Sequence, residues 1–253
     1  MWVARIVTTL VLTAHGSKDP RSGANARAIA GRIARMRPGL DVRLAFCDLN
    51  TPSLTDVLNS LSGTARAAVV TPLLLANAYH ARIDIPGQIA GCGAAERGIE
   101  VRQSEVLGVD PRLVSLLRRR VMESGVSRLD DRVGVLVVAI GSSDAAANAH
   151  SAQVAPKLMA GTRWAGATTA FVTRPNPSLA EAADLLRRRG AQRVVIAPWF
   201  LAPGRLPNRV REFADDAGVP LAAPLGAHRL VAETVLDRFD QVLKKAPAQR
   251  IAA

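Results

Sequence analysis

The chain contains one series of sequence segments twice, and the second copy follows the first after about 125 residues. Three pairs of segments carry this repeat: VLTAHGSKD at 11–19 with VVAIGSSD at 137–144, AFCDLNTPSL at 45–54 with AFVTRPNPSL at 170–179, and VVTPLLL at 69–75 with VIAPWFL at 195–201. A duplicated series of segments constrains the fold strongly, because each copy must form a similar structure. The sequence therefore predicts two similar tandem domains.

Three side chains that can bind a metal are present in the first copy and replaced in the second. In the register of the repeat, the correspondences are His15 with Ile140, Asp48 with Thr173, and His80 with Leu206. We therefore expect residues 1–126 to form an N-terminal domain with a metal site. Residues 132–253 are expected to form a second copy without metal ligands, and the polar segment 122–132 is the candidate linker.

The chain has 253 residues, of which 49% are hydrophobic, so each half can bury a core of its own. No apolar run is long enough to span a membrane. The opening apolar stretch 6–14 leads directly into His15-Gly16-Ser17, a position that the repeat also contains. We therefore expect it to be a first strand and not a removable signal.

Apolar β-branched runs alternate with amphipathic stretches along the chain. The first half predicts strands at about 5–14, 41–47, 66–76 and 99–105, and helices at 20–36, 53–62, 85–97 and 111–124; the second half repeats this order from about residue 133. Asp19-Pro20, Thr51-Pro52 and Asn176-Pro177 have the composition of helix starts. The alternation predicts an α/β fold in which each domain is a parallel sheet flanked by helices, with flavodoxin-like or Rossmann-like topology.

The three candidate ligands follow three successive predicted strands. Since ligands gather beyond the carboxyl ends of the strands in an open parallel sheet, His15, Asp48 and His80 are expected at one edge. Each has a structural alternative: His15 can bond a loop carbonyl, Asp48 can form a turn or cap a helix, and His80 can pair with Asp84. His150 and His228 fall in predicted helical segments and are expected to be surface or packing residues.

Two imidazoles and a carboxylate suit Fe²⁺, Co²⁺, Ni²⁺ or Zn²⁺ better than Ca²⁺ or Mg²⁺. The two cysteines, Cys47 and Cys92, are not spaced as a metal-binding pair or a disulfide framework, so a reducing cytoplasm is the expected location. Gly16 and Ser17 are expected to shape a tight turn whose backbone N–H groups can hold an anion.

The formal net charge of +12 leaves three interpretations. The charge can bind a nucleic acid, suit a polyanionic small molecule, or reflect an arginine-rich proteome. The arginine runs 118–120 and 187–189 lie in predicted helices without interleaved aromatic residues, which favours solvated helix faces over a nucleic-acid surface.

With HGSKDPR at 15–21, AFCDLNTPS at 45–53 and HARIDIP at 80–86, the chain resembles the sirohydrochlorin chelatases, a family of class II chelatases, in their long duplicated form. The resemblance implies two α/β domains that face a central cleft. It also implies a lyase that inserts Fe²⁺ or Co²⁺ into sirohydrochlorin, for siroheme or cobalamin biosynthesis. The family's two metal-site histidines match His15 and His80. Asp48 stands where family members often have Glu.

From this resemblance we expect insertion with release of two protons, with Fe²⁺ as the favoured metal substrate and no organic cofactor. His15, His80 and Asp48 are the expected metal-binding and catalytic residues. The expected substrate-binding residues are Ser17, Lys18, Arg21, Tyr79, Arg82, Arg205 and Arg209, and Leu73 is a further candidate contact. We expect a cytoplasmic monomer that binds neither nucleic acid nor membrane. The alternative is a tetrapyrrole or metal carrier without catalysis.

Overall fold

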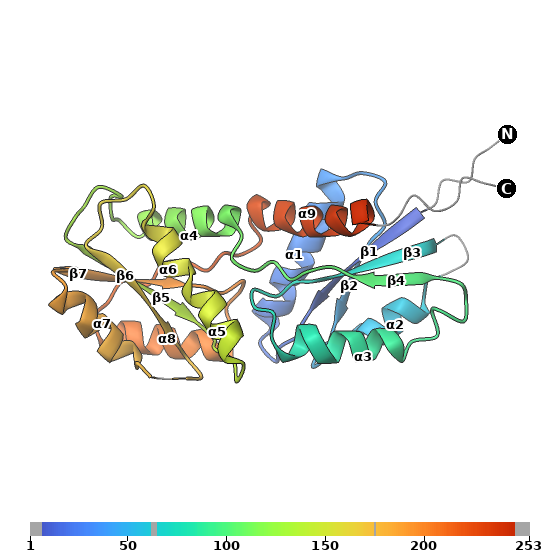
Figure 1. The fold of residues 1–253 in the computed structure, drawn as a ribbon, viewed down its shortest axis with the longest axis horizontal. Coiled ribbons are helices and arrows are strands. Elements are labelled where there is room, and N and C mark those ends of the chain that lie inside the picture. Colours follow the sequence, from blue (N-terminus) through green and yellow to red (C-terminus); the bar gives the residue numbers. More distant parts are fainter. Residues whose placement is uncertain (1–6, 62–64, 175, 246–253) are drawn as a thin grey trace. The chain divides into compact units, whose positions relative to one another are not determined.

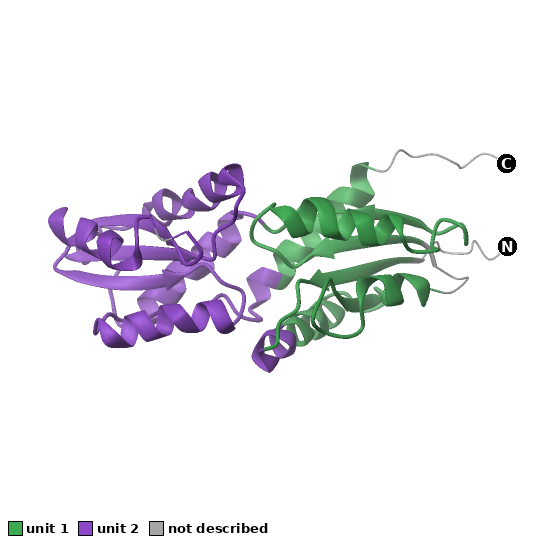
Figure 2. Ribbon diagram, turned by 90° about the horizontal axis from the view of Figure 1, so that it is seen from below, with its two compact units in different colours: residues 1–18, 26–107, 232–253 green, residues 19–25, 108–231 purple. Residues whose placement is uncertain are grey.

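The computed structural model describes residues 7–61, 65–174 and 176–245. By their internal contacts these residues divide into two compact units, each treated by itself below (Figure 2). The first unit comprises the described residues of 1–18, 26–107 and 232–253, and the second comprises those of 19–25 and 108–231.

The first unit is built on a four-stranded parallel sheet with the order β2-β1-β3-β4. Its strands are β1 (Val7–Ala14), β2 (Val42–Phe46), β3 (Ala65–Pro72) and β4 (Glu100–Gln103). In β1, Leu10, Val11 and Leu12 are fully buried, as expected for a central strand covered on both faces. The chain leaves β1 toward β2 on one side and returns to β3 on the other. The carboxyl ends of β1 and β3 therefore flank the switch point of the sheet, where ligands of open α/β sheets bind.

Helices cover both faces of this sheet (Figure 1). They are α1 (Pro20–Met36, from residue 26 in this unit), α2 (Leu54–Asn59), the π-helix η1 (His80–Asp84), α3 (Ile85–Ala90) and α9 (Arg229–Lys245, from residue 232 in this unit). On one face, Leu54 and Leu58 of α2 and Ile85 of α3 pack with Val11 and Val70 in a single buried cluster. This cluster fixes the strand ends and the segment 80–85 as one packed body.

The second unit is built on a three-stranded parallel sheet with the order β6-β5-β7. Its strands are β5 (Val133–Ala139), β6 (Gly166–Phe171) and β7 (Arg193–Pro198), and its helices are α4 (Pro111–Glu123), α5 (Ala145–Ala152), α6 (Val154–Met159), α7 (Leu179–Arg188) and α8 (Arg205–Asp216). Every residue of β5 is buried. Leu186 of α7 and Val210 of α8 share a core cluster with Leu136 and Val138 of β5. The predicted fold class, two parallel sheets flanked by helices, is confirmed.

The fourth strand expected in the second copy is not formed within the described residues. At that position Leu221 makes one isolated parallel bridge to Ile196. Ile196 N donates to Pro220 O at 2.8 Å, and Ala222 N donates to Ile196 O at 2.9 Å. Because Pro220 and Pro224 lack the N–H that a ladder needs, the pairing does not extend.

The predicted helix 85–97 is also shorter in the structure. It begins as η1 at His80 and ends at Ala90, where Gly91 is the C-cap. Gly91 and Gly93 disfavour continuation, because glycine loses more conformational entropy in a helix than other residues do. The prolines of Thr51-Pro52 and Asn176-Pro177 were expected at helix starts, but they do not occupy the first helical position. Each precedes a serine, Ser53 or Ser178, that caps its helix in a capping box.

Those two capping boxes show the duplication in three dimensions. Ser53 accepts from Asp56 N at 3.1 Å, and Ser178 accepts from Glu181 N at 3.2 Å. In both copies the preceding X–Pro bond is cis. Matching positions of the sequence repeat thus carry matching local structure.

The two contact-based units do not coincide with the sequence repeat. The candidate linker 122–132 packs inside the second unit, since Trp164 Nε1 donates to Ser127 O at 2.9 Å and Arg163 N donates to Arg128 O at 2.8 Å. Helix α9, at the end of the second copy, belongs largely to the first unit. The division into domains 1–126 and 132–253 stays a prediction about the repeat.

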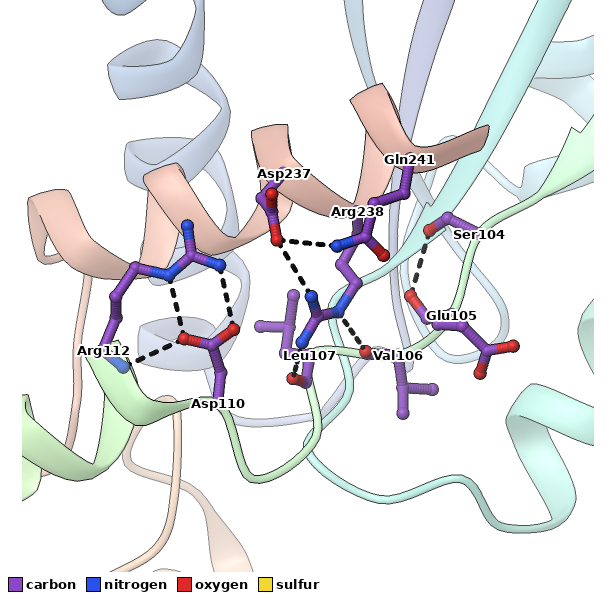
Figure 3. A network of polar contacts seen from close by, with 9 residues as sticks. All are labelled: Ser104, Glu105, Val106, Leu107, Asp110, Arg112, Asp237, Arg238 and Gln241. Carbon is purple, nitrogen blue, oxygen red and sulfur yellow. Dashed lines mark hydrogen bonds and ion pairs between the residues drawn. The ribbon is translucent and has the colours of Figure 1, made fainter. Parts of the chain in front are cut away.

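Arginine contacts hold α9 in the first unit (Figure 3). Arg238 donates from Nε to Val106 O and from Nη2 to Leu107 O, both at 3.0 Å, and its Nη1 pairs with Asp237. Arg37, which follows α1, makes a two-pronged ion pair with Asp240 at 2.6 Å. These contacts stabilise the packing of α9 within the first unit. In the second unit, Asp110 caps α4 and accepts from the Arg112 guanidinium.

Candidate metal-binding site

His15 is the first residue after β1, at the carboxyl edge of the first sheet. The next residue, Gly16, has a φ of 102°, and a Cβ at this position would lie 1.8 Å from Asp48 O. Glycine is therefore required here both for the left-handed backbone and for the close approach of the two loops. Asp48 N donates to His15 O at 2.9 Å and closes the junction.

His80 opens η1 after the loop that follows β3. Its ring lies against that of His15, with the centroids 3.9 Å apart and an interplanar angle of 65°. Both residues belong to the first unit. The structure thus brings together the two imidazoles that the sequence places far apart, at the switch point of the sheet.

Asp84 is the carboxylate that contacts the His80 ring of this pair. Its Oδ2 lies 2.5 Å from His80 Nδ1, and both residues belong to η1. The pairing considered for His80 from the sequence is therefore present. A π-helical turn widens the backbone and often occurs at functional sites. Here it places the imidazole and the carboxylate on one face.

Asp48 lies in the loop that follows β2. Its side chain is exposed, and its Oδ1 accepts from Leu49 N at 2.7 Å, so part of the carboxylate shapes a turn. Leu49 has a φ of 61°, an unusual value for a non-glycine residue. Within the described parts of the chain, no group of three or more His, Cys, Asp or Glu side chains is arranged to hold a metal ion. The observed arrangement is a pair of imidazoles with a carboxylate on one of them.

Burial and neighbouring charges shift the pKa values of two groups in this site, His15 and Cys47. Burial lowers the pKa of His15 from its ordinary value of 6.5, and the charge of His80 lowers it further, against smaller raising effects that include Asp48 and Asp84. His15 is therefore biased toward the neutral form that binds metal. Burial raises the pKa of the Cys47 thiol to about 11, with contributions from Asp84 and Asp48. Cys47 is thus a neutral thiol in this site.

Side-chain amides that the sequence did not single out brace the site. Gln88 Nε2 donates to Cys47 O at 2.9 Å, Gln103 Nε2 donates to Ala81 O at 2.7 Å, and Asn50 Oδ1 accepts from Ser17 N at 2.7 Å. They link the loop after β2 to α3, η1 to β4, and the His15 loop to the Asp48 loop. Single amides of this kind have no distinctive spacing, so the sequence pattern gave no signal for them.

The predicted substrate-binding residues fall in both units. Ser17, Lys18, Tyr79 and Arg82 belong to the first unit, where Tyr79 is 61% exposed with its ring centroid 6.0 Å from that of His80. Arg21, Arg205 and Arg209 belong to the second unit. Arg21 pairs with Asp19 at 2.6 Å and donates to Asn208 at 3.1 Å, whereas Arg205 and Arg209 are exposed on α8. Leu73 is 5% exposed, so it is a core residue.

The second copy retains the backbone of the site without its ligands. Thr173 N donates to Ile140 O at 2.9 Å, as Asp48 N does to His15 O, and Gly141 has a φ of 91°. Ile140 is 42% exposed. The remaining histidines lie elsewhere: His150 is exposed on α5, and His228 precedes α9 and accepts from Leu230 N.

Fold and site together define a two-unit parallel α/β protein with a pair of imidazoles at the carboxyl edge of one sheet. The model of the CbiX family matches residues 9–124 and 134–242, and the chain belongs to this family. The resemblance to the sirohydrochlorin chelatases seen in the sequence is thereby confirmed.

Curated relatives agree with this assignment, and a solved structure has a similar fold. The chain is 32% identical over 203 residues to a sirohydrochlorin ferrochelatase of Priestia megaterium, which covers 78% of this chain and 74% of that protein. It is 25% identical over 250 residues to a sirohydrochlorin cobaltochelatase of the same organism, covering 93% and 80%. SirB from Bacillus subtilis with Fe³⁺ has a similar fold, with a TM-score of 0.78, 22% identity, and coverage of 92% and 94%.

None of the described helices is both long and apolar enough to cross a membrane.

Proposed function

We propose that the chain is a sirohydrochlorin chelatase that inserts a divalent metal ion into the macrocycle with release of two protons. The contact between the rings of His15 and His80 is the observation that carries this proposal. The curated relatives named as sirohydrochlorin ferrochelatase and cobaltochelatase support the substrate and the reaction type.

The chemistry of the pair suits a metal that must be passed on. Two imidazoles leave coordination positions open, and the absence of a thiolate from the pair argues against a closed structural zinc site. His15 Nδ1 is buried and finds no hydrogen-bond partner among the described protein groups. A buried polar atom of this kind is costly unless a ligand satisfies it. A metal ion held by the pair would satisfy such an atom or reorient its ring.

Insertion replaces two pyrrole N–H protons by one M²⁺ ion, so two protons must leave the macrocycle. The lowered pKa of His15 keeps its imidazole neutral near pH 7, ready to bind metal or accept a proton. Asp48 is proposed as a further metal ligand or proton acceptor, because its carboxylate is exposed and its charge acts on His15. Its Oδ2 is the oxygen available for this role, since Oδ1 accepts from Leu49.

The net charge of +12 suits a polycarboxylate substrate. Lys18, Arg82, Arg205 and Arg209 are exposed cationic side chains that we propose as partners of the substrate carboxylates, together with Arg21 and the backbone near Ser17. Tyr79 is proposed as an apolar contact to the macrocycle. We favour Fe²⁺ over Co²⁺ as the metal.

We further propose that the protein acts in the cytoplasm as a monomer, without an organic cofactor, nucleic acid or membrane as a partner. The free cysteines Cys47 and Cys92 support a reducing compartment. Two copies of the domain in one chain support the monomer.

The test is metal insertion followed by the absorbance of sirohydrochlorin with Fe²⁺ or Co²⁺, under anaerobic conditions. His15→Ala and His80→Ala should each lower the rate at least about 100-fold, since ligand loss exceeds the 10- to 100-fold cost of losing an outer-sphere partner. His150→Ala should retain the wild-type rate, because His150 is exposed on α5 of the other unit. Wild-type rates in both site variants would refute the assignment. Binding of metal and macrocycle without acceleration by the wild type would identify a carrier instead.

A further inference from the structure

We propose that Asp84 is a positioning residue that fixes the tautomer and ring orientation of His80, so that His80 presents its Nε2 lone pair to a divalent metal ion. The use of that lone pair rests on the proposed chelatase function. The orientation itself follows from the geometry of η1.

The contact between the two side chains determines where the ring hydrogen lies. Asp84 Oδ2 is 2.5 Å from His80 Nδ1. An ionised carboxylate has no hydrogen to donate, so Nδ1 must carry the hydrogen of this bond. In the neutral imidazole Nε2 is then the acceptor atom. Metal-binding histidines in proteins are commonly held in this way by a carboxylate on their other nitrogen, which also makes them stronger ligands.

The backbone holds Asp84 in place for this task. Ile85 N donates to His80 O, five residues back, which defines the π-helical turn. Ala81 and Ile85 are 3% and 0% exposed and anchor the turn in the core, and Gln103 Nε2 fixes Ala81 O from β4. The side chains of His80 and Asp84 remain 42% and 30% exposed. Ala81 and Ile85 therefore anchor the turn in the core, while the imidazole of His80 and the carboxylate of Asp84 stay accessible to solvent.

The charge of Asp84 also acts on two other groups of the site. It acts to raise the pKa of the His15 imidazole, against the larger lowering effect of burial, and it acts to raise the pKa of the Cys47 thiol. Asp48 acts on the same two groups, but its Oδ1 is bonded to Leu49 N. Of the two carboxylates, Asp84 is the one with a direct bond to an imidazole of the pair.

The proposal is tested by NMR of the histidine ring nitrogens at alkaline pH, where the imidazoles are neutral. In the wild type His80 should carry its hydrogen on Nδ1. Asp84→Leu should shift His80 toward the Nε2–H form that an unpartnered imidazole prefers. Asp84→Asn keeps an oxygen that can accept from Nδ1–H, so it should shift the His80 tautomer less than Asp84→Leu does. Asp48→Asn is the matched carboxylate control and should leave the His80 tautomer unchanged.

Binding of Co²⁺ alone, measured by its visible absorbance, gives the second readout. Asp84→Leu should weaken Co²⁺ binding about 10- to 100-fold, the usual cost of removing such a partner. An Nε2–H form of His80 in the wild type would overturn the proposal without any variant. An unchanged tautomer or unchanged Co²⁺ affinity in a folded Asp84→Leu protein would also overturn it. Failure of the wild type to insert metal would instead remove the proposed function, because tautomer and Co²⁺ binding are measured without the macrocycle.

Discussion

The imidazoles of His15 and His80 contact each other with their ring centroids 3.9 Å apart, although one follows β1 and the other opens η1 after β3. Adjacent parallel strands bring these two positions together, because β1 and β3 pair from Val7 with Ala65 to Thr13 with Pro72. The contact is therefore a consequence of sheet order, and it lets the charge of His80 act on His15.

That influence predicts how His15 titrates. Burial and the charge of His80 lower its pKa below 6.5, so NMR of the imidazoles should show His15 with a midpoint below that value. In His80→Asn the midpoint should rise toward 6.5 but stay below it, since burial, the larger cause, remains. A midpoint that does not move would show that the ring charges are uncoupled.

The same shift has a consequence for stability. As the pH falls below 6.5, the unfolded chain binds a proton at His15 before the folded protein does. His15 therefore destabilises the folded state increasingly between pH 6.5 and its folded pKa, and has no such effect above pH 6.5. His15→Gln should lose less stability than the wild type over that interval in denaturant unfolding. An equal or greater loss would contradict the lowered pKa.

The position of the two histidines can be predicted from the sequence together with the topology of a parallel sheet. Apolar β-branched runs predict the strands, and the carboxyl-edge rule then predicts that His15 and His80 meet. The choice between carboxylates does not follow in this way. Asp48 has the expected position after a strand, but its Oδ1 bonds the next backbone N–H, whereas Asp84 reaches His80 through a π-helical turn. Hydrophobic periodicity carries no signal that separates such a turn from an α-helix.

The unit to which α9 belongs could not be predicted from the sequence either. The repeat assigns α9 to the second half, yet its contacts place it in the first unit from residue 232. The cause is tertiary: Arg238 donates to carbonyl groups that follow β4, and Arg37 pairs with Asp240. An amphipathic helix can cover either of two similar sheets, so local sequence does not select between them.

The geometry of Gly16 predicts a strong requirement for glycine where the His15 loop meets the Asp48 loop. A methyl group there meets Asp48 O at 1.8 Å and the φ is 102°, whereas Gly39, with a φ of 87°, has no atom within 4 Å of an added Cβ. Gly39→Ala should cost about 1–2 kcal/mol for the left-handed backbone alone. Gly16→Ala should cost about 1–3 kcal/mol more through overpacking, and should weaken Co²⁺ binding.

Denaturant midpoints of the two variants measure this difference, because both changes add the same methyl group to a glycine with positive φ. Equal stabilities would show that the Asp48 loop moves aside without cost. In that event the close approach of Gly16 to the Asp48 loop would not be needed to hold the site loops in position.

Cys47 predicts a thiol of low reactivity. Its pKa is raised to about 11, chiefly by burial and then by the charges of Asp84 and Asp48. Alkylation by iodoacetamide in a Cys92→Ala background should therefore be slow near pH 8 and accelerate as the pH approaches 11, since the thiolate is the nucleophile. Asp84→Asn removes a negative charge, lowers the pKa, and should speed alkylation at a fixed pH. A rate that falls in this variant would contradict the assigned cause.

The contacts of Arg238 predict that the packing of α9 stabilises the first unit. Its side chain is 16% exposed and supplies donors to the carbonyl groups of Val106 and Leu107, which are 8% and 0% exposed. Arg238→Leu would leave both acceptors without these donors, at a cost of about 1–3 kcal/mol in the free energy of unfolding. Arg238→Lys should recover only part of this lost stability, because an ammonium group can donate to a carbonyl but cannot reproduce the planar fork of the guanidinium. Arg188→Leu, an exposed change on α7, is the matched control and should stay within about 0.5 kcal/mol of the wild type. If Arg238→Leu matched that control, the contacts of Arg238 would contribute nothing to the stability of the first unit, and other contacts of α9, such as the Arg37–Asp240 ion pair, would hold the helix in place.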